Sequence, residues 1–333
     1  MRLFWLAFTL SSLLLAGCAA PSQHGPVSAG TLRRLQEHAI SAQDFLSRLK
    51  GLDPQIRASL PRQPVLVPFE MKHGTPVILA RGPGDRPLPM LLDSGAARVV
   101  LGARDALKAG VPTVDSKQAQ ATLLGVVGRE QGLVGLISPL QIGTWRLPSY
   151  PCFVRTFEVS GEAAAHAANI LGFDLVARYC SYLTLDYRAH AATFGFGSRF
   201  QPSASLRHSS APFRFQQGVA FIDLTAKGKT WSSILDSGSF NGIEIDEAVA
   251  RKLGVQDQGK IVEGLVLMAV GGVVSSEKAR LRTVTLPSVS LLGGRYPDAE
   301  VDIAPGVPRV GSYFLKDYRV TFDFRARRVW LEW

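Results

Sequence analysis

The chain has 333 residues, and its 37 lysines and arginines against 27 aspartates and glutamates give it a net charge of +10. The basic residues are dispersed, as on a solvated surface, and form no basic helix or aromatic ladder that would predict binding to nucleic acid. Its six histidines and three cysteines include no ligand pair of the kind a zinc site needs, so we predict neither a metal nor another cofactor.

The first 18 residues have the pattern of an export signal. Arg2 gives a positive start, and the apolar run 3–15 is too short to favour a membrane-spanning helix. The run ends in Leu-Ala-Gly followed by Cys18, which resembles a bacterial lipobox, whose cysteine is diacylated and becomes the mature N-terminus. The resemblance implies a protein anchored in the cell envelope by lipid on Cys18. The alternative is an ordinary secretory peptide cleaved nearby.

Residue 19 bears on the choice of membrane. In a Gram-negative host, an aspartate directly after the lipidated cysteine resembles the inner-membrane retention signal. Ala19 occupies that place here, which favours the outer membrane, with the protein facing the periplasm.

Residues 19–64 are predicted to form a tether and a helix. Residues 19–30 are mostly small or polar, as in a flexible linker. Apolar residues then recur at steps of three and four, which predicts one amphipathic helix packed on the body of the protein. These residues are Leu32, Leu35, Ala39, Ala42, Leu46 and Leu49.

Two short motifs carry the chemistry. Each is an apolar strand that ends in Asp-Ser-Gly, with the aspartate at Asp93 in the first and Asp236 in the second. One Asp-Ser-Gly is weak evidence, because the tripeptide is also a common turn in which the aspartate only caps backbone amides. Two in one chain suggest a pair of facing carboxylates. Such a pair shares one proton, polarises a water molecule and protonates a leaving amine.

The surroundings of the two aspartates also repeat. A Val-Gly step places a glycine 35 residues after each aspartate, and an apolar-Gly turn and a strand with an acid and an aromatic residue follow. The chain therefore contains one module of ordinary domain size twice, over residues 65–199 and 212–333. The matched positions are Val127 with Gly128, Val270 with Gly271, Gly172 with Gly311, and Asp186 with Asp323.

This order of features resembles the retropepsin-like aspartic peptidases. The resemblance implies an all-β, mostly antiparallel fold with short helices, in which two similar lobes each supply one catalytic aspartate and one flap hairpin. It implies that Asp93 and Asp236 are catalytic. Four neighbours would support the turns, and the two Val-Gly steps would lie in the flaps. The supporting residues are Ser94, Gly95, Ser237 and Gly238, and the flap residues are Val127, Gly128, Val270 and Gly271.

The turn residues have physical reasons as well. Gly95 and Gly238 allow the opposite lobe to approach closely, and the hydroxyls of Ser94 and Ser237 can donate hydrogen bonds across the interface. The chain departs from the family pattern at other places. Serine replaces the commoner threonine after both aspartates, neither flap carries the tyrosine of pepsin-type flaps, and Arg309 occupies the position where the apolar pair of the second lobe begins.

The remaining segments agree with this architecture. Strand-like stretches, residues 213–224 among them, are separated by turn residues. A short helix is expected after each Asp-Ser-Gly, over residues 104–109 and 246–253, because a glycine follows each as a stop signal. The serine-rich residues 197–211 would connect the lobes. The two cysteines outside the leader, Cys152 and Cys180, either pair or stay buried as thiols.

These features predict a monomeric, lipid-anchored aspartic endopeptidase that hydrolyses a peptide or protein through an Asp-Asp pair and an activated water. One alternative is an inactive peptide-binding lipoprotein with the same fold. The other is a homodimer in which each lobe pairs with the same lobe of a second molecule.

Overall fold

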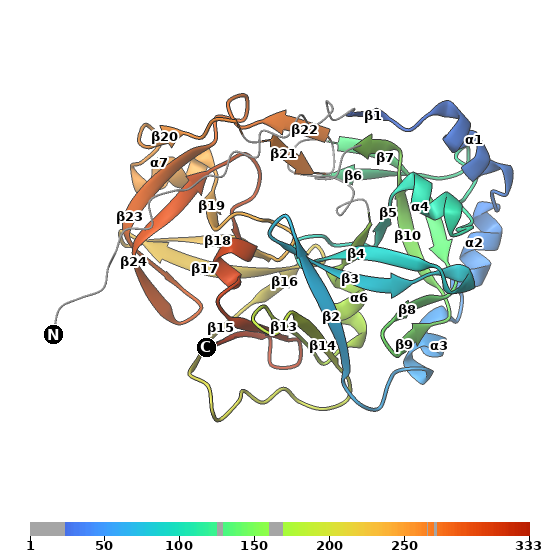
Figure 1. The fold of residues 1–333 in the computed structure, drawn as a ribbon, viewed down its shortest axis with the longest axis horizontal. Coiled ribbons are helices and arrows are strands. Elements are labelled where there is room, and N and C mark those ends of the chain that lie inside the picture. The colour runs from blue at the N-terminus through green and yellow to red at the C-terminus, as the bar shows by residue number, and fades with distance from the viewer. Residues whose placement is uncertain (1–23, 125–128, 160–168, 265, 270–271) are drawn as a thin grey trace.

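The computed structural model describes residues 24–124, 129–159, 169–264, 266–269 and 272–333 (Figure 1). Strands dominate this part of the chain, and none of its described helices exceeds nine residues, so the predicted fold class is confirmed. Within the described residues, no helix has the length and apolar content needed to cross a membrane.

The N-terminal part forms three short helices where one amphipathic helix was predicted. Its elements are β1 (His24–Pro26), α1 (Ala29–Glu37), α2 (Ala42–Leu49) and α3 (Leu52–Ala58). The helical path breaks at Ile40, whose N–H donates to the Thr113 carbonyl and whose carbonyl accepts from the Asp115 N–H. Ser41 then caps α2. A spacing of three and four residues cannot reveal such a break, because the bonds that cause it come from the distant first lobe.

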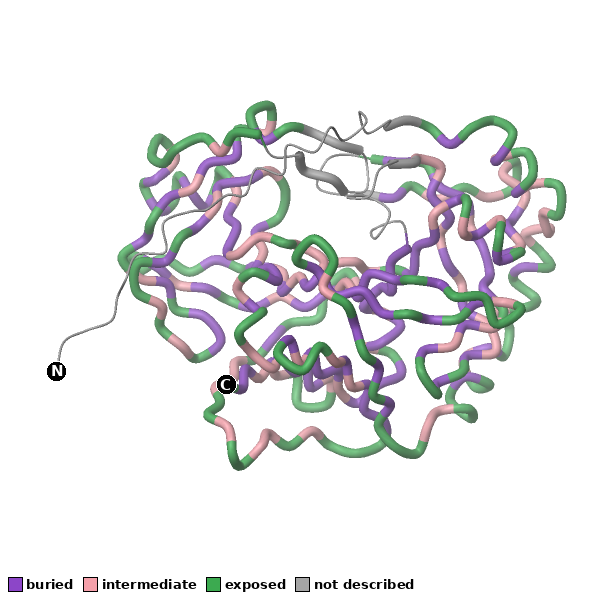
Figure 2. Tube along the Cα trace, viewed as in Figure 1, coloured by how far each residue is buried: buried purple, intermediate pink, exposed green. Residues whose placement is uncertain are grey.

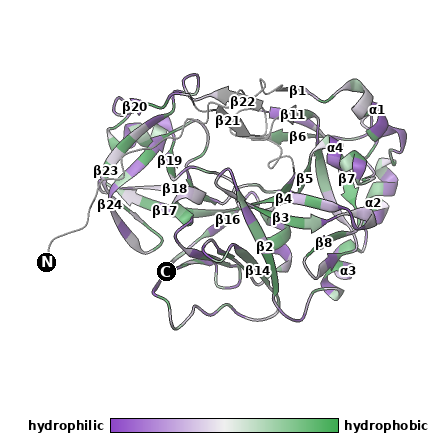
Figure 3. Ribbon diagram, in the orientation of Figure 1, coloured by the Kyte–Doolittle hydropathy of each residue, from purple (hydrophilic) through white to green (hydrophobic). Residues whose placement is uncertain are grey.

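The first lobe begins at β2, in which buried and exposed residues alternate because one face packs on the core. Figure 3 shows hydrophobic residues along β2 to β4. The elements of this lobe are β2 (Val65–Lys72), β3 (Thr75–Arg81), η1 (Pro83–Asp85), β4 (Pro87–Asp93), β5 (Val100–Leu101), α4 (Ala103–Lys108), β6 (Gln120–Leu124), β7 (Arg129–Ile137), β8 (Leu140–Ile142), β9 (Trp145–Leu147), β10 (Tyr150–Arg155), β11 (Phe157–Val159), β12 (Ile170–Gly172), α6 (Phe173–Tyr179), β13 (Tyr182–Asp186) and β14 (Ala191–Gly195).

The second lobe repeats the plan. Its elements are β15 (His208–Pro212), β16 (Arg214–Gln216), β17 (Val219–Ala226), β18 (Lys229–Asp236), β19 (Ile243–Ile245), α7 (Glu247–Leu253), β20 (Lys260–Ile261), β21 (Val266–Ala269), β22 (Gly272–Ser275), β23 (Arg282–Leu291), β24 (Gly294–Ile303), β25 (Arg309–Gly311), α8 (Ser312–Leu315), β26 (Arg319–Asp323) and β27 (Arg328–Glu332). In both lobes, the strand that ends in the Asp-Ser-Gly aspartate pairs in parallel with the strand of the later apolar-Gly turn, with Asp93 opposite Gly172 and Asp236 opposite Gly311.

The expected short helices are present as α4 and α7, each followed within two residues by a glycine of positive φ, Gly110 and Gly254. The single strand expected over residues 213–224 is a hairpin instead, β16 followed by β17. The turn between these strands is Gln217-Gly218, and both residues have positive φ, so the chain reverses inside the apolar stretch. Residues 197–211 were predicted to connect the lobes. The last four of them, 208–211, belong to strand β15, which pairs with β27.

One sheet section joins the lobes. Its strand order is β15-β27-β26-β13-β14-β2, so three strands of the second lobe are followed by three of the first, and the lobes meet where β26 pairs with β13. β13 and β26 pair antiparallel with Thr184 opposite Thr321, and the two hydroxyls lie 2.8 Å apart. In Figure 1 this section lies at the bottom, and the hairpins β6–β7 and β21–β22 lie at the top. The sheet therefore holds the two lobes in one fixed relation below the Asp-Ser-Gly turns.

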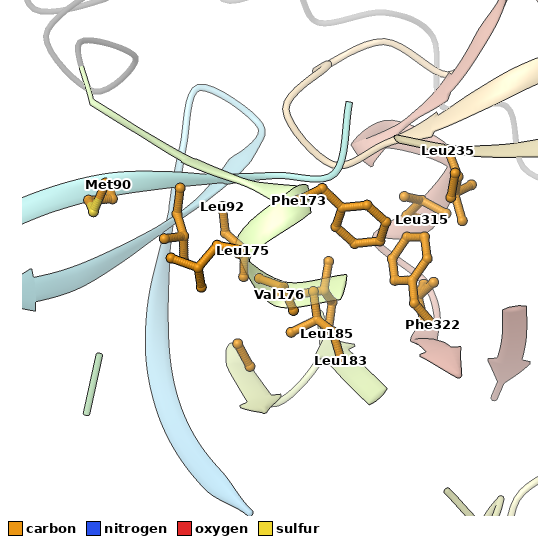
Figure 4. Packing of buried hydrophobic residues seen from close by; sticks show 14 of the residues in the cluster. Met90, Leu92, Phe173, Leu175, Val176, Leu183, Leu185, Leu235, Leu315 and Phe322 are labelled. Carbon is orange, nitrogen blue, oxygen red and sulfur yellow. The ribbon is translucent and has the colours of Figure 1, made fainter. Parts of the chain in front are cut away.

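The hydrophobic core is also continuous between the lobes. Figure 2 shows buried residues through both, and Figure 4 shows side chains of both lobes packed together. Phe173 of α6 and Phe322 of β26 are almost completely buried, with ring centroids 4.8 Å apart in an edge-to-face contact. Aromatic pairs of this kind stabilise beyond the area they bury.

We expect Phe173→Ala to lower the free energy of unfolding by about 3–5 kcal/mol, because it removes a buried ring shared by both lobes. Phe215 is the matched control, since it contacts Phe173 but is 43% exposed. Phe215→Ala should cost about 1 kcal/mol or less. Chemical denaturation of the three proteins measures both values, and equal losses would show that the interlobe packing is not a main source of stability.

Candidate active site

The two aspartates end matched strands and are held in the same way. Asp93 Oδ1 accepts a hydrogen bond of 2.8 Å from the Gly95 N–H, and Asp236 Oδ1 accepts one of 2.9 Å from the Gly238 N–H. The Ser239 N–H adds a second bond to Asp236. The chain turns sharply after each strand, so one oxygen of each carboxyl is fixed by its own backbone.

The serines join the two turns. The Ser94 hydroxyl donates to the Leu235 carbonyl at 2.7 Å, and the Ser237 hydroxyl donates to the Leu92 carbonyl at 2.6 Å. Each hydroxyl also accepts a bond of 2.9 Å from the N–H of the other serine. Both side chains are buried. The hydrogen bonds expected across the interface are therefore present. Each turn makes the same two bonds to the other, as in a local two-fold arrangement.

The turn glycines leave the space in which the opposite carboxyl lies. A Cβ at Gly95 would lie 2.5 Å from Asp236 Oδ1, and a Cβ at Gly238 would lie 2.5 Å from Asp93 Oδ1. Such distances are far inside van der Waals contact. Each carboxyl is therefore packed against the turn of the other lobe, which brings the two acids together within one chain.

The surroundings of Asp93 change its acidity. The pKa of Asp93 is raised well above its ordinary value, first by burial and then by the charge of Asp236. Two neighbouring carboxylates cannot both be ionised easily, because their like charges repel. A pair of acids placed in this way therefore favours the state that holds one proton.

Two further hydroxyl groups are linked to the turn that carries Asp236. The Ser312 hydroxyl donates to the Ser237 carbonyl at 2.8 Å, and the Tyr187 hydroxyl lies 3.2 Å from Ser312 Oγ. Burial raises the pKa of Tyr187, so this phenol stays protonated and acts as a neutral donor. Sequence reasoning missed both residues. The only signal was their place beside matched features, Tyr187 after Asp186 and Ser312 after Gly311.

Two charged residues outside the Asp-Ser-Gly motifs also lie here. Arg309 Nη1 is 3.8 Å from Asp236 Oδ2, and Arg309 Nε is 2.7 Å from Glu244 Oε2. Glu244 is buried, and the Asn241 side-chain amide donates to its other oxygen. In the sequence, Arg309 is visible only as a departure from the apolar pattern, and no motif indicates Glu244.

The four predicted flap residues, Val127, Gly128, Val270 and Gly271, lie outside the described residues, as does Cys18. The strands that flank the flap positions are described. β6 pairs antiparallel with β7, and β21 pairs antiparallel with β22. An antiparallel strand pair therefore lies at the matched place in each lobe.

The other predicted positions have structural roles. Asp186 accepts from the Ala189 N–H, and Asp323 accepts from the N–H groups of Arg325 and Ala326, so both acids cap turns at strand ends. Cys152 and Cys180 are separate buried thiols and form no disulfide. Among the described residues, no group of three or more His, Cys, Asp or Glu is placed to hold a metal ion.

Comparison with known families supports the same class. Residues 80–175 match a family described as aspartyl protease. The match includes Asp93 and its turn and ends before the second lobe. No curated protein matches the chain. The resemblance to aspartic peptidases is thus confirmed, and the chain carries an aspartyl-protease-like domain.

Proposed function

We propose that the protein is an aspartic endopeptidase whose active site is Asp93 and Asp236 of a single chain. One observation carries the proposal: two matched Asp-Ser-Gly turns pack each carboxyl against the turn of the other lobe, where burial and the charge of Asp236 raise the pKa of Asp93. A protein that only binds peptides has no need of this pair. Since both carboxyls come from one chain, a second copy is not needed to complete the site.

The chemistry follows from the shared proton. The ionised carboxylate takes a proton from a water molecule, which attacks the carbonyl carbon of the peptide bond. The protonated carboxyl hydrogen-bonds the carbonyl oxygen and stabilises the tetrahedral intermediate. Proton transfer to the leaving nitrogen then breaks the C–N bond and restores the starting protonation state. The backbone bonds to Asp93 and Asp236 keep both acids in place throughout.

The substrate would be an extended peptide. The hairpins β6–β7 and β21–β22 lie on one side of the molecule, opposite the interlobe sheet (Figure 1). Extended peptides bind to exposed strand edges through main-chain hydrogen bonds, which suits hairpins of this kind.

Incubation of the purified protein with a peptide library, from acidic to neutral pH, tests the proposal. Cleavage at internal bonds that a statine-type transition-state mimic inhibits is the expected result. Binding of peptides without cleavage at any pH would favour the inactive binding protein instead.

We also propose attachment to the envelope membrane, in the outer membrane facing the periplasm, through lipid on Cys18. β1 pairs with β11 of the first lobe and contacts β22 of the second. Five residues separate Cys18 from β1, a span of about 20 Å at most. The lipid would therefore be attached near the hairpins, and the site would act on substrates close to the bilayer.

We expect Cys18→Ala to abolish membrane association, because the variant lacks the thiol that carries the lipid. Membrane fractionation of cells that produce each protein measures this, with Cys152→Ala as the control, since that thiol is buried within the first lobe. A Cys18→Ala protein that is processed and still fractionates with membranes as the unaltered protein does would rule out the lipid anchor.

A further inference from the structure

Arg309 and Glu244 occupy a place where the two lobes differ in chemistry. In the first lobe, Ile170 of β12 lies opposite Val100 of β5 in an antiparallel bridge. In the second lobe, β25 lies opposite β19 in the same way, with Arg309 facing Glu244. The fold is the same, but one lobe has an apolar cross-strand pair and the other has an ion pair.

The fold itself does not require the charges. In the first lobe, Ile170 and Val100 are buried with Leu123 in a small apolar cluster. In the second lobe, the side chains of Arg309 and Glu244 are only 12% and 6% exposed. Burying an ion pair contributes no more stability than well-packed apolar residues of similar volume, and often less. The charged pair therefore has a reason other than packing.

That reason is visible in what Arg309 faces. Glu244 holds the Nε side of the guanidinium at 2.7 Å, and Nη1 lies 3.8 Å from Asp236 Oδ2. An ion pair this close favours the charged form of the carboxylate. At the matched position of the first lobe, Asp93 has Ile170, which carries no charge. The backbones of the two aspartates are thus arranged alike, but their electrostatic surroundings differ. A cation lies beside Asp236, and an apolar residue occupies the matched position in the first lobe.

We propose that Arg309, positioned by Glu244, keeps Asp236 ionised and confines the shared proton to Asp93. Asp236 is then the base that takes a proton from water, and Asp93 is the acid that faces the peptide carbonyl. The assignment of these roles rests on the proposed function, whereas the placement of the proton does not. Arg309 and Glu244 are positioning residues.

The groups around Arg309 agree with this assignment. Asp93, Asp236 and Tyr187 face the site from β4, β18 and the end of β13, and Glu244 and Asp302 lie on β19 and β24. Burial raises the pKa of Glu244, and the Arg309 charge opposes that rise. Burial also raises the pKa of Asp302, which accepts a hydrogen bond from Thr283. The other groups named here are acids or a phenol, so Arg309 is the one among them that carries a positive charge.

NMR titration of the carboxyl carbons tests the inference without any need for activity. In the unaltered protein, ¹³Cγ shifts should show the shared proton on Asp93, with Asp236 remaining a carboxylate over the same pH range. The test variant carries Arg309→Ile with Glu244→Val, which gives the second lobe the apolar pair of the first. In this variant the proton should be divided between the two acids, and uptake of the second proton should move up by about one pH unit.

Two controls accompany the titration. Arg309→Lys keeps the cation and should leave the proton on Asp93. Arg214→Gln with Asp223→Asn removes an exposed ion pair of the same lobe and should change neither signal. An even division of the proton in the unaltered protein would overturn the inference even if the double variant failed to fold.

Kinetics separates the inference from the proposed function. If the unaltered protein cleaves peptides, the acidic limb of its rate profile should move to higher pH in the double variant by the same amount as the NMR titration. A protein that shows the asymmetric titration but never cleaves peptides would refute the proposed function and leave the inference standing. Cleavage with an unchanged profile in the folded variant would refute the inference alone.

Discussion

Asp93→Asn and Asp236→Asn are each expected to lower the rate of peptide hydrolysis by about 10³-fold or more, because an amide cannot share the proton. Asparagine has nearly the same shape and keeps an oxygen for the bond from the Gly95 or Gly238 N–H, so both variants should fold. Since the two acids act as one unit, the double variant should be little worse than either single one.

Steady-state kinetics with circular dichroism as a check on folding measures this effect. Asp186→Asn is the matched control, because Asp186 also ends a strand but only caps a turn. Its variant should retain hydrolysis. A folded Asp93→Asn or Asp236→Asn protein that kept most of its activity would contradict the shared-proton mechanism.

Gly238→Ala is expected to lower hydrolysis by about 10²-fold or more, because the new methyl group would occupy the space of the Asp93 carboxyl. The Cβ would lie 2.5 Å from Asp93 Oδ1 and 2.6 Å from Oδ2. The acid must move away, and displacements of about 1 Å in a catalytic group cost that much. Gly95→Ala should act in the same way on Asp236.

Gly242→Ala provides the control in the same loop region. A Cβ there would meet only Tyr313 at 3.7 Å, which is ordinary contact, and its variant should keep full activity. Rates and thermal unfolding of the three alanine variants should be measured together. Full activity in Gly238→Ala would show that the carboxyls are not packed against the opposite turn.

The sequence predicted the paired turns well because their geometry is local and occurs twice. An apolar strand that ends in Asp-Ser-Gly determines its own backbone bonds, such as that from the Gly95 N–H to Asp93. The equal spacing to later features then indicated that the lobes match. The structure extends this to hydrogen bonds between Ser94 and Ser237, which the hydroxyls made possible.

What the sequence could not predict depends on residues that meet only in the folded protein. Arg309 was visible as an unusual residue, but its partner Glu244 lies on another strand, and no local pattern gives that register. The break at Ile40 has the same cause, since its bonds go to Thr113 and Asp115 of the first lobe. The state of the two cysteines likewise required the positions of distant strands.

Calorimetric titration with a statine-type transition-state mimic tests the central claim most directly, because such a compound binds between the two carboxyls. One molecule per chain is the predicted result, with binding lost or greatly weakened in Asp236→Asn. Equal affinity in the unaltered protein and in Asp236→Asn, or one molecule bound per two chains, would contradict an active site formed by Asp93 and Asp236 of a single chain.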